Sequence, residues 1–217
     1  MNPNPVRLSA DQRREQILAA ATRVFGELGY AGATTDRVAR AAGISQPYVV
    51  RLFGTKEQLF LETLRHTLAR VLSVFREALA AEDVGGPATG PGPGPGPGPG
   101  PGPGPGYETE ARLGAAYLAL VEDRGTLLTL LHGFLMGSDP VIGPVARDGL
   151  LQVFRLLRDE AGFAPEQIRR FLADGALMNT LLASGIGLAV ERDPDAADLI
   201  ACTFGPHVGA VLGRASA

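Results

Sequence analysis

A tract of alternating glycine and proline, residues 90–106, constrains most strongly how this chain of 217 residues can fold. Proline at every second position removes backbone donors and excludes both an α-helix and a paired strand. Collagen requires glycine at every third position, and the dinucleotide pattern G-x-G-x-x-G is also absent, so neither structure is predicted here. We expect a linker resembling polyproline II, which would span ~50 Å at ~3.1 Å per residue. Regular structure must then lie on either side of the tract.

The residues on both sides of the tract favour helices, and the sequence predicts an all-α fold. Tryptophan is absent, β-branched residues are sparse, and alanine, leucine, arginine and glutamate dominate outside the tract. Apolar residues recur at helical spacing along both parts. The predicted helices cover residues 10–28, 35–42, 46–52, about 56–81, 108–123, 125–137, 140–161, 165–190 and 194–213.

Several helix ends are marked by capping residues. Ser9 with Gln12, and Thr55 with Gln58, have the spacing of capping boxes. Gly29 is expected to end the first helix. Pro140, Pro165 and Pro194 are each expected in the first turn of a helix, where a missing N–H costs little.

The charges are unevenly distributed, although the chain as a whole has a net charge of -3. Residues 1–60 hold 8 Lys and Arg against 5 Asp and Glu, whereas residues 61–217 hold 12 against 18. A basic N-terminal region on an acidic remainder suggests a polyanionic partner, although chance asymmetry would look the same. The single cysteine, Cys202, excludes an internal disulfide and fits a reducing, cytoplasmic setting. We expect neither a signal peptide nor a membrane span.

No set of residues predicts catalysis or cofactor binding. The histidines, at positions 66, 132 and 207, lack companions at metal-ligand spacing, so neither a metal site nor a cofactor is expected. Phosphate-binding loops, nucleophile elbows and zinc-protease motifs are missing from the sequence. Cys202 lies in an apolar run and is interpreted as a packing residue. The chain is therefore not expected to be an enzyme.

Residues 34–53 instead predict a helix-turn-helix motif, because two short helices flank a glycine turn. Ser45 is expected to cap the second helix, and Pro47 falls in its first turn, so the proline marks a helix start. Such a helix fits the major groove of DNA, where glutamine pairs with adenine and arginine with guanine. The alternative is that the motif is an inert packing unit. The residues expected to contact bases or phosphates are Thr34, Thr35, Ser45, Gln46, Pro47, Tyr48, Arg51 and Lys56.

Residues 17–60 also resemble the DNA-binding domain of TetR-family transcriptional regulators. The resemblance is carried, in order and spacing, by Phe25, Gly29-Tyr30, Thr34, Val38-Ala39, Ala42-Gly43-Ile44-Ser45, Phe53 and Lys56-Glu57. It implies a homodimeric repressor that binds a palindromic operator and is released by a small-molecule effector. Two departures concern the recognition helix. The family often has a small residue at the position of Pro47 and a tyrosine at that of Val50, whereas the tyrosine here is Tyr48.

We therefore assign residues 1–54 to a helix-turn-helix DNA-binding domain and residues 55–217 to a helical ligand-binding and dimerisation domain. The last two predicted helices carry more apolar surface than a small bundle buries, which suggests a homodimer, unless both are core helices of a monomer. The rival functions are a helical enzyme or ligand carrier and a non-specific nucleoid-type DNA binder. The candidate effector contacts, chosen by helical face, are Tyr117, Leu131, His132, Leu135, Phe154, Met178 and Asn179.

Overall fold

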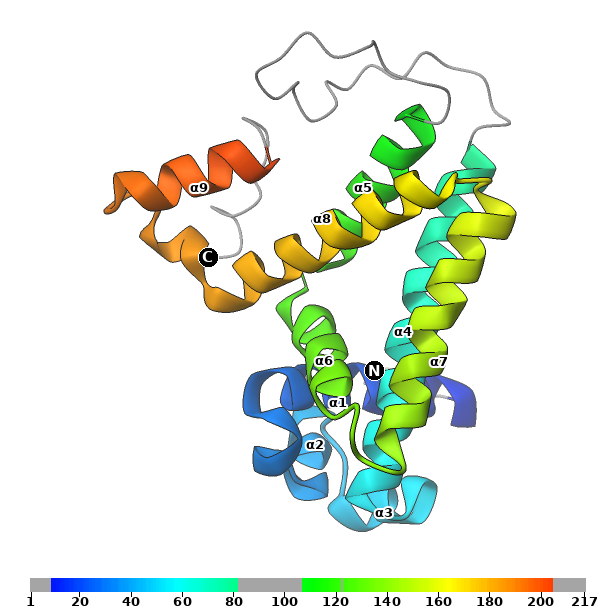
Figure 1. Cartoon of the computed structure of the whole chain (residues 1–217). Helices are drawn as coiled ribbons and strands as arrows, with labels where there is room; N and C mark the ends of the chain where they lie inside the picture. The colour runs from blue at the N-terminus through cyan, green and yellow to red at the C-terminus, as the bar shows by residue number, and fades with distance from the viewer. Residues whose placement is uncertain (1–8, 82–106, 122, 205–217) are drawn as a thin grey trace, which may run out of the picture. The chain divides into compact units, whose positions relative to one another are not determined.

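The computed structural model of the chain describes residues 9–81, 107–121 and 123–204. Helices joined by turns make up these residues, and the described ranges contain no strand, which confirms the all-α prediction (Figure 1). The elements in chain order are α1 (Ala10–Gly32), α2 (Thr35–Ala41), α3 (Gln46–Phe53), α4 (Lys56–Ala80), α5 (Tyr107–Val121), α6 (Arg124–Leu135), α7 (Ile142–Arg155), η2 (Leu156–Glu160), α8 (Pro165–Ser184), η3 (Ile186–Ala189) and α9 (Pro194–Phe204).

Helix α1 begins and breaks where the sequence predicts. Ser9 and Gln12 form a reciprocal capping box, in which the Ser9 side chain accepts the Gln12 N–H at 3.1 Å and the Gln12 side chain accepts the Ser9 N–H at 2.8 Å. Gly29 adopts a φ of 66° and interrupts the helix, which then adds a short turn to Gly32. At the start of α4, the Thr55 hydroxyl accepts the Gln58 N–H at 3.1 Å.

Two helix limits in the C-terminal half differ from the prediction. Helix α7 begins at Ile142 because the Asp139 carboxylate accepts the N–H groups of Val141 and Ile142, both at 2.8 Å, which leaves Pro140 before the helix. The hydrogen bonds at Asp139 lower the pKa of its carboxyl below the ordinary value. The last turn of the helix expected to reach residue 161 is instead the π-helix η2.

Helix α8 also ends earlier than residue 190. Gly185 adopts a left-handed conformation with a φ of 71°, which a side chain would disfavour, and this ends the α-helix at Ser184. The following 3₁₀ turn, η3, leads to α9. The glycine–proline tract at residues 90–106 and the expected end of the last helix at residues 205–213 lie outside the described residues.

The chain divides into two compact units. The head unit comprises Met1–Ala69 and Leu128–Gly149, and the body unit comprises Arg70–Leu127 and Leu150–Ala217. Helices α4, α6 and α7 each contribute residues to both units. These units are defined by packing, so the assignment of functions to residues 1–54 and 55–217 remains a prediction.

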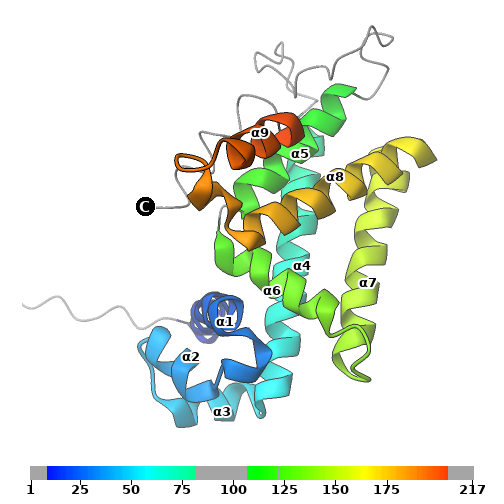
Figure 2. The same ribbon diagram turned by 60° about the vertical axis from the view of Figure 1, so that its left-hand side comes forward.

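Helices α1, α2 and α3 gather around the first half of α4 in the head unit (Figure 2). Its core holds the rings of Phe25, Tyr30 and Phe60, whose centroids lie 4.9 Å apart for Phe25–Phe60 and 5.2 Å apart for Tyr30–Phe60. The second half of α6 joins this core, because the Thr129 hydroxyl donates to the Thr22 carbonyl at 3.0 Å. Gly133 of α6 leaves room for Leu64, whose Cδ1 would lie 2.7 Å from an added Cβ.

In the body unit, α5 lies against α8, and η3 contacts both α8 and α9. An aromatic cluster links three of its helices, with Phe75 of α4 lying 5.9 Å from Tyr117 of α5 and 5.8 Å from Phe171 of α8, measured between ring centroids. Ion pairs also join elements of this unit. Arg170 of α8 binds Glu110 of α5, and Arg76 of α4 binds Glu160 of η2.

Candidate nucleic-acid interface

Helices α2 and α3 are held together by a tight turn and a shared apolar core. The Thr34 side chain caps α2 by accepting the Arg37 N–H at 3.2 Å. Gly43 then turns the chain with a φ of 65°, a conformation that favours glycine, and the Ile44 N–H donates to the Ala39 carbonyl at 3.0 Å. Val49 of α3 is completely buried in the head core. Two short helices at a fixed angle to one another result, which is the helix-turn-helix arrangement.

The faces of α3 follow from helical geometry, because successive side chains are rotated by about 100°. Val49 and Phe53 are buried, which fixes the inner face. Pro47 and Arg51 are exposed on the opposite side. Gln46 and Tyr48 are half-buried on the flanks and so remain more exposed than Val49 and Phe53. Ser45 is the N-cap residue of α3, as predicted, and has the extended backbone of a cap residue, but its side chain makes no capping hydrogen bond.

Contacts within the motif orient three of the predicted DNA-binding side chains. The Gln46 amide nitrogen donates to the Thr35 hydroxyl of α2 at 3.3 Å. The Arg51 guanidinium lies over the Tyr48 ring, 4.8 Å from its centroid. Such a cation–π contact restricts a long side chain that would otherwise sample many rotamers. Tyr48 and Arg51 therefore form a stacked pair on the surface of α3.

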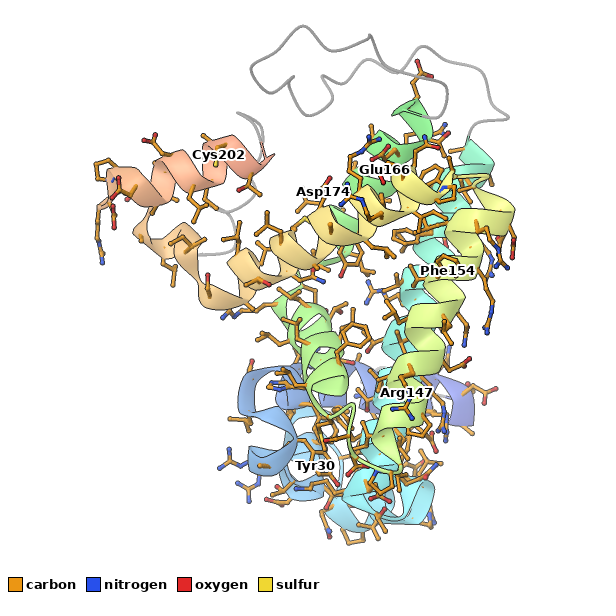
Figure 3. All side chains as sticks on the ribbon, in the orientation of Figure 1. Tyr30, Arg147, Phe154, Glu166, Asp174 and Cys202 are labelled. Carbon is orange, nitrogen blue, oxygen red and sulfur yellow. The ribbon has the colours of Figure 1, made fainter. Side chains whose placement is uncertain are left out.

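Lys56, at the first position of α4, is fixed against the end of α1. Its ammonium donates to the Tyr30 carbonyl at 3.0 Å and lies 4.6 Å from the centroid of the Tyr30 ring. Tyr30 lies within the head unit (Figure 3), where partial burial, followed by the charges of Glu57 and Asp139, raises the pKa of its phenol. An ammonium has three donors, so the Tyr30 carbonyl leaves Lys56 others for a phosphate.

The motif also exposes residues that the sequence analysis did not predict as DNA contacts. Arg37 and Arg40 of α2 are exposed, and Arg40 forms an ion pair with Asp36 at 2.5 Å. Val50 of α3 is an exposed apolar residue, with 39% of its surface accessible. The signal for Arg37 and Arg40 was their position off the apolar face of α2, which Val38 and Ala39 form.

The candidate effector contacts fall into two groups. Tyr117, Phe154, Met178 and Asn179 belong to the body unit, and of these Tyr117 and Asn179 meet. The Tyr117 hydroxyl donates to the Asn179 Oδ1 at 3.0 Å and accepts from its Nδ2 at 2.9 Å. Burial raises the pKa of the Tyr117 phenol, and its bond to Asn179 opposes that shift. Phe154 projects from α7 (Figure 3) and carries the Arg158 guanidinium 5.3 Å from its ring centroid.

The remaining candidates, Leu131, His132 and Leu135, belong to the head unit. His132 packs beside Gly29, because its Cε1 would lie 3.4 Å from a Cβ added there. Leu135 is 81% exposed at the end of α6. The seven residues thus do not form one cluster within either unit, and their role in ligand binding remains a prediction.

The described residues contain neither a metal-binding cluster nor a membrane-spanning helix. Within the described ranges, no group of three or more His, Cys, Asp or Glu side chains is arranged to hold a metal ion. None of the helices in that part of the chain is both long enough and apolar enough to cross a membrane.

The all-α fold and the α2–α3 motif define a helix-turn-helix protein of the DNA-binding type. The sequence profile described as "Bacterial regulatory proteins, tetR family" matches residues 17–63, which include the whole motif. Residues 17–63 are thus similar to the DNA-binding region of tetR-family regulators. This confirms the resemblance drawn from the sequence.

Curated relatives match about a third of the chain. The transcriptional activator FasR from Mycolicibacterium smegmatis is 40% identical over 73 residues, which are 34% of this chain and 33% of FasR. The transcriptional repressor AcnR from Corynebacterium glutamicum is 40% identical over 78 residues, or 36% of this chain and 42% of AcnR. The matched region thus spans less than half the length of these relatives.

Solved structures resemble the fold over nearly the whole chain. A TetR-like transcriptional regulator from Rhodococcus sp. RHA1 aligns with a TM-score of 0.54 at 25% identity, covering 96% of this chain and 97% of that one. The fatty acid degradation regulator FadR from Bacillus halodurans aligns with a TM-score of 0.55 at 16% identity, covering 93% and 98%. At 16% identity, the similarity to FadR shows the fold alone.

Proposed function

We propose that this chain is a DNA-binding transcriptional regulator that binds a palindromic operator as a homodimer, represses transcription and is released by a small-molecule effector. The observation that carries the proposal is the outer face of α3. There Arg51 is exposed and stacked on Tyr48, while Gln46 is anchored to Thr35 on α2. None of these three side chains belongs to the buried core, so packing alone does not require them.

The chemistry of this face suits the major groove. An exposed guanidinium can donate two hydrogen bonds to O6 and N7 of guanine, and its stack on Tyr48 reduces the rotamer freedom lost on binding. An amide nitrogen carries two hydrogens, so the bond from Gln46 to Thr35 leaves one N–H and the carbonyl oxygen for adenine. Gln46 and Arg51 are therefore proposed to contact bases.

The other predicted residues are proposed to contact the DNA backbone. Thr34 and Ser45 are exposed next to the helix starts, and Thr35 is half-buried on α2. Pro47 lies on the outer face of α3, and Lys56 lies at the N-terminus of α4, where free backbone N–H groups also attract phosphate. Because neutralising phosphates releases counterions, the affinity is expected to fall steeply with salt concentration.

A dimer would present two copies of α3 to successive major grooves, about 34 Å apart. The proposed dimer surface is formed by α8 and α9, on which Leu177 and Leu199 are exposed. An effector would act by preferring the form in which the two copies of α3 do not match that spacing. The relatives' names support regulation of transcription, and AcnR is named a repressor, whereas FasR is named an activator. A cytoplasmic location and the absence of catalysis are parts of the same proposal.

A titration separates this proposal from its rivals. The full chain would first be used to select duplexes from a random library, and the enriched duplex would then be compared with a scrambled duplex of equal composition at fixed salt. We expect the enriched duplex to bind about 10³-fold tighter or more. Equal affinity for both duplexes would favour a non-specific nucleoid-type binder. No binding to either would favour a ligand carrier or enzyme.

Repression requires a second assay. A reporter controlled by a promoter that overlaps the enriched duplex should fall in activity when the chain is expressed, because the bound dimer would occlude the promoter. A rise in activity would show that the chain is an activator and would contradict the repressor part of the proposal.

A further inference from the structure

We propose that Val50 is a specificity-determining residue, and that its methyl groups contact the C5-methyl group of one thymine in each half of the operator. This inference rests on the proposed function, because it assumes that the outer face of α3 enters the major groove. It adds an apolar contact to the hydrogen bonds assigned to Gln46 and Arg51.

The first argument is the exposure of Val50. The core contacts of α3 are made by its neighbour Val49 and by Phe53, which are 0% and 3% exposed. Val50 keeps 39% of its surface accessible. A β-branched side chain has a lower helix propensity than alanine, so an exposed valine within an eight-residue helix does not help that helix to form. Helix propensity therefore gives no reason for valine at this position.

The second argument is the side of α3 on which Val50 lies. Gln46 and Val50 are separated by four residues, so they are neighbours on one flank, whereas Tyr48 and Arg51 occupy the other flank and the centre of the outer face. The bond from Gln46 to Thr35 fixes its side chain on that flank. A glutamine that pairs with adenine therefore brings Val50 toward the same or the adjacent base pair.

The third argument is the chemistry of an adenine–thymine pair. In the major groove, adenine presents the acceptor and donor that suit glutamine, and thymine presents a C5-methyl group that suits an apolar side chain. The amide of Gln46 and the methyl groups of Val50 match these two features on one flank of α3. The geometry points to an adenine–thymine step next to the base pair that Arg51 contacts.

The test uses the full chain and the duplex enriched from a random library. Each thymine in one half-site is replaced singly by deoxyuridine, which removes the C5-methyl group and leaves the pairing intact. For the unchanged chain we expect a loss of affinity of about threefold to tenfold at one thymine, the size expected for one buried methyl group. Val50→Ala should weaken binding to the unsubstituted duplex by a similar factor, and deoxyuridine at that thymine should then have little further effect.

Val141→Ala is the matched control. Val141 is also an exposed valine of the head unit, with 42% of its surface accessible, and it lies outside α3. This variant should keep both the affinity and the sensitivity to deoxyuridine. Circular dichroism and thermal unfolding of Val50→Ala should match those of the unchanged chain, because an exposed residue is replaced by a better helix former.

Two results would overturn the inference while leaving the proposed function intact. One is specific binding in which no single thymine methyl group matters. The other is a thymine effect that persists undiminished in Val50→Ala, which would assign the methyl contact to another residue. If no duplex is enriched at all, the proposed function fails and the inference fails with it.

Discussion

The head and body units each contain an aromatic cluster, and the tyrosines of the two clusters contact different kinds of polar group. In the head, Phe25, Tyr30 and Phe60 pack together, and the ring and carbonyl of Tyr30 also hold Lys56. In the body, Phe75 packs on Tyr117, whose hydroxyl turns to the buried Asn179. The head cluster thus supports a charged side chain that is proposed to contact DNA. In the body cluster, the hydroxyl of Tyr117 and the amide of Asn179 are hydrogen-bonded to each other.

This difference explains why candidate functional residues are easier to identify in the head. Polar side chains in the helix-turn-helix motif reach the surface and have donors left over after their internal contacts. In the body, Tyr117 and Asn179 satisfy one another, which a structural role explains as well as a ligand-binding role does. The following predictions test whether the two units differ in this way.

The largest effect is expected from truncating a ring in each cluster. Phe60→Ala and Phe75→Ala should each lower the free energy of unfolding by about 3–5 kcal/mol, because both rings are fully or almost fully buried. Denaturant unfolding measures this loss. The folded fraction of Phe75→Ala should keep its affinity for the enriched duplex, whereas Phe60→Ala should lose affinity, because its ring supports Tyr30. Equal losses of affinity in the two variants would contradict the distinction between the units.

The next largest effect is expected at a close approach in the head unit. A Cβ on Gly143 would lie 2.3 Å from the Gly137 carbonyl oxygen, to which Arg147 donates at 2.8 Å. Gly143→Ala should therefore destabilise the chain by about 3 kcal/mol, since backbone must move.

The matched control is Gly114→Ala in α5 of the body, where an added Cβ would meet nothing within 4 Å. This change should raise the free energy of unfolding by about 0.5–1 kcal/mol, because alanine is the better helix former. A neutral Gly143→Ala would show that the turn before α7 is not rigid.

A smaller effect is expected from separating the polar pair of the body. Tyr117→Phe removes the hydroxyl and leaves the Asn179 amide, which is 8% exposed, without that partner. The free energy of unfolding should fall by about 1–2 kcal/mol, and the double variant Tyr117→Phe with Asn179→Leu should recover part of it. Thermal unfolding of Tyr117→Phe, of Asn179→Leu and of the double variant completes the cycle. If Tyr117→Phe were neutral for stability, the purely structural interpretation of the pair would be wrong.

The smallest effect is expected from the exposed ion pair between Arg76 and Glu160. Nε and one terminal nitrogen of the guanidinium each donate to a carboxylate oxygen at 2.8 Å. Hydrogen bonding from Arg76 lowers the pKa of Glu160 below 4.5, so the pair stabilises the fold above that pH and is lost as the pH falls through the lowered value. Glu160→Gln should therefore cost about 0.2–1 kcal/mol near pH 7 and nothing in strong acid.

Unfolding at several pH values measures this difference, with Glu191→Gln, an exposed carboxylate outside that ion pair, as the control. A cost for Glu160→Gln that did not change with pH would show that lost packing, and not the ion pair, is responsible.

The sequence predicted most of the head, because its signals are local. Capping at Ser9, the turn at Gly43 and the proline in the first turn of α3 act within a few residues, so each can be recognised from neighbouring positions. The same local reasoning placed the N-cap of α3 at Ser45 but not the absence of a hydrogen bond from its hydroxyl. It failed at Gly185, which apolar periodicity continuing through the next residues concealed.

Contacts between distant residues could not be predicted. The bond from Lys56 to Tyr30 and the approach of Gly133 to Leu64 depend on how helices pack, and a single sequence does not encode those pairings in any local pattern. The candidate effector residues were chosen by helical face, and faces alone do not tell which helices meet. For this reason Leu131, His132 and Leu135 belong to a different unit from the other four.

The central claim is that Arg51, held on Tyr48, contacts a base in the major groove. The most direct test is the affinity of Arg51→Ala for the enriched duplex and for the scrambled duplex, measured at one salt concentration. We predict that the variant loses about 1–3 kcal/mol on the enriched duplex and much less on the scrambled one. An equal loss on both duplexes would show that Arg51 contacts phosphate alone, and no loss on either would contradict the proposed role of α3.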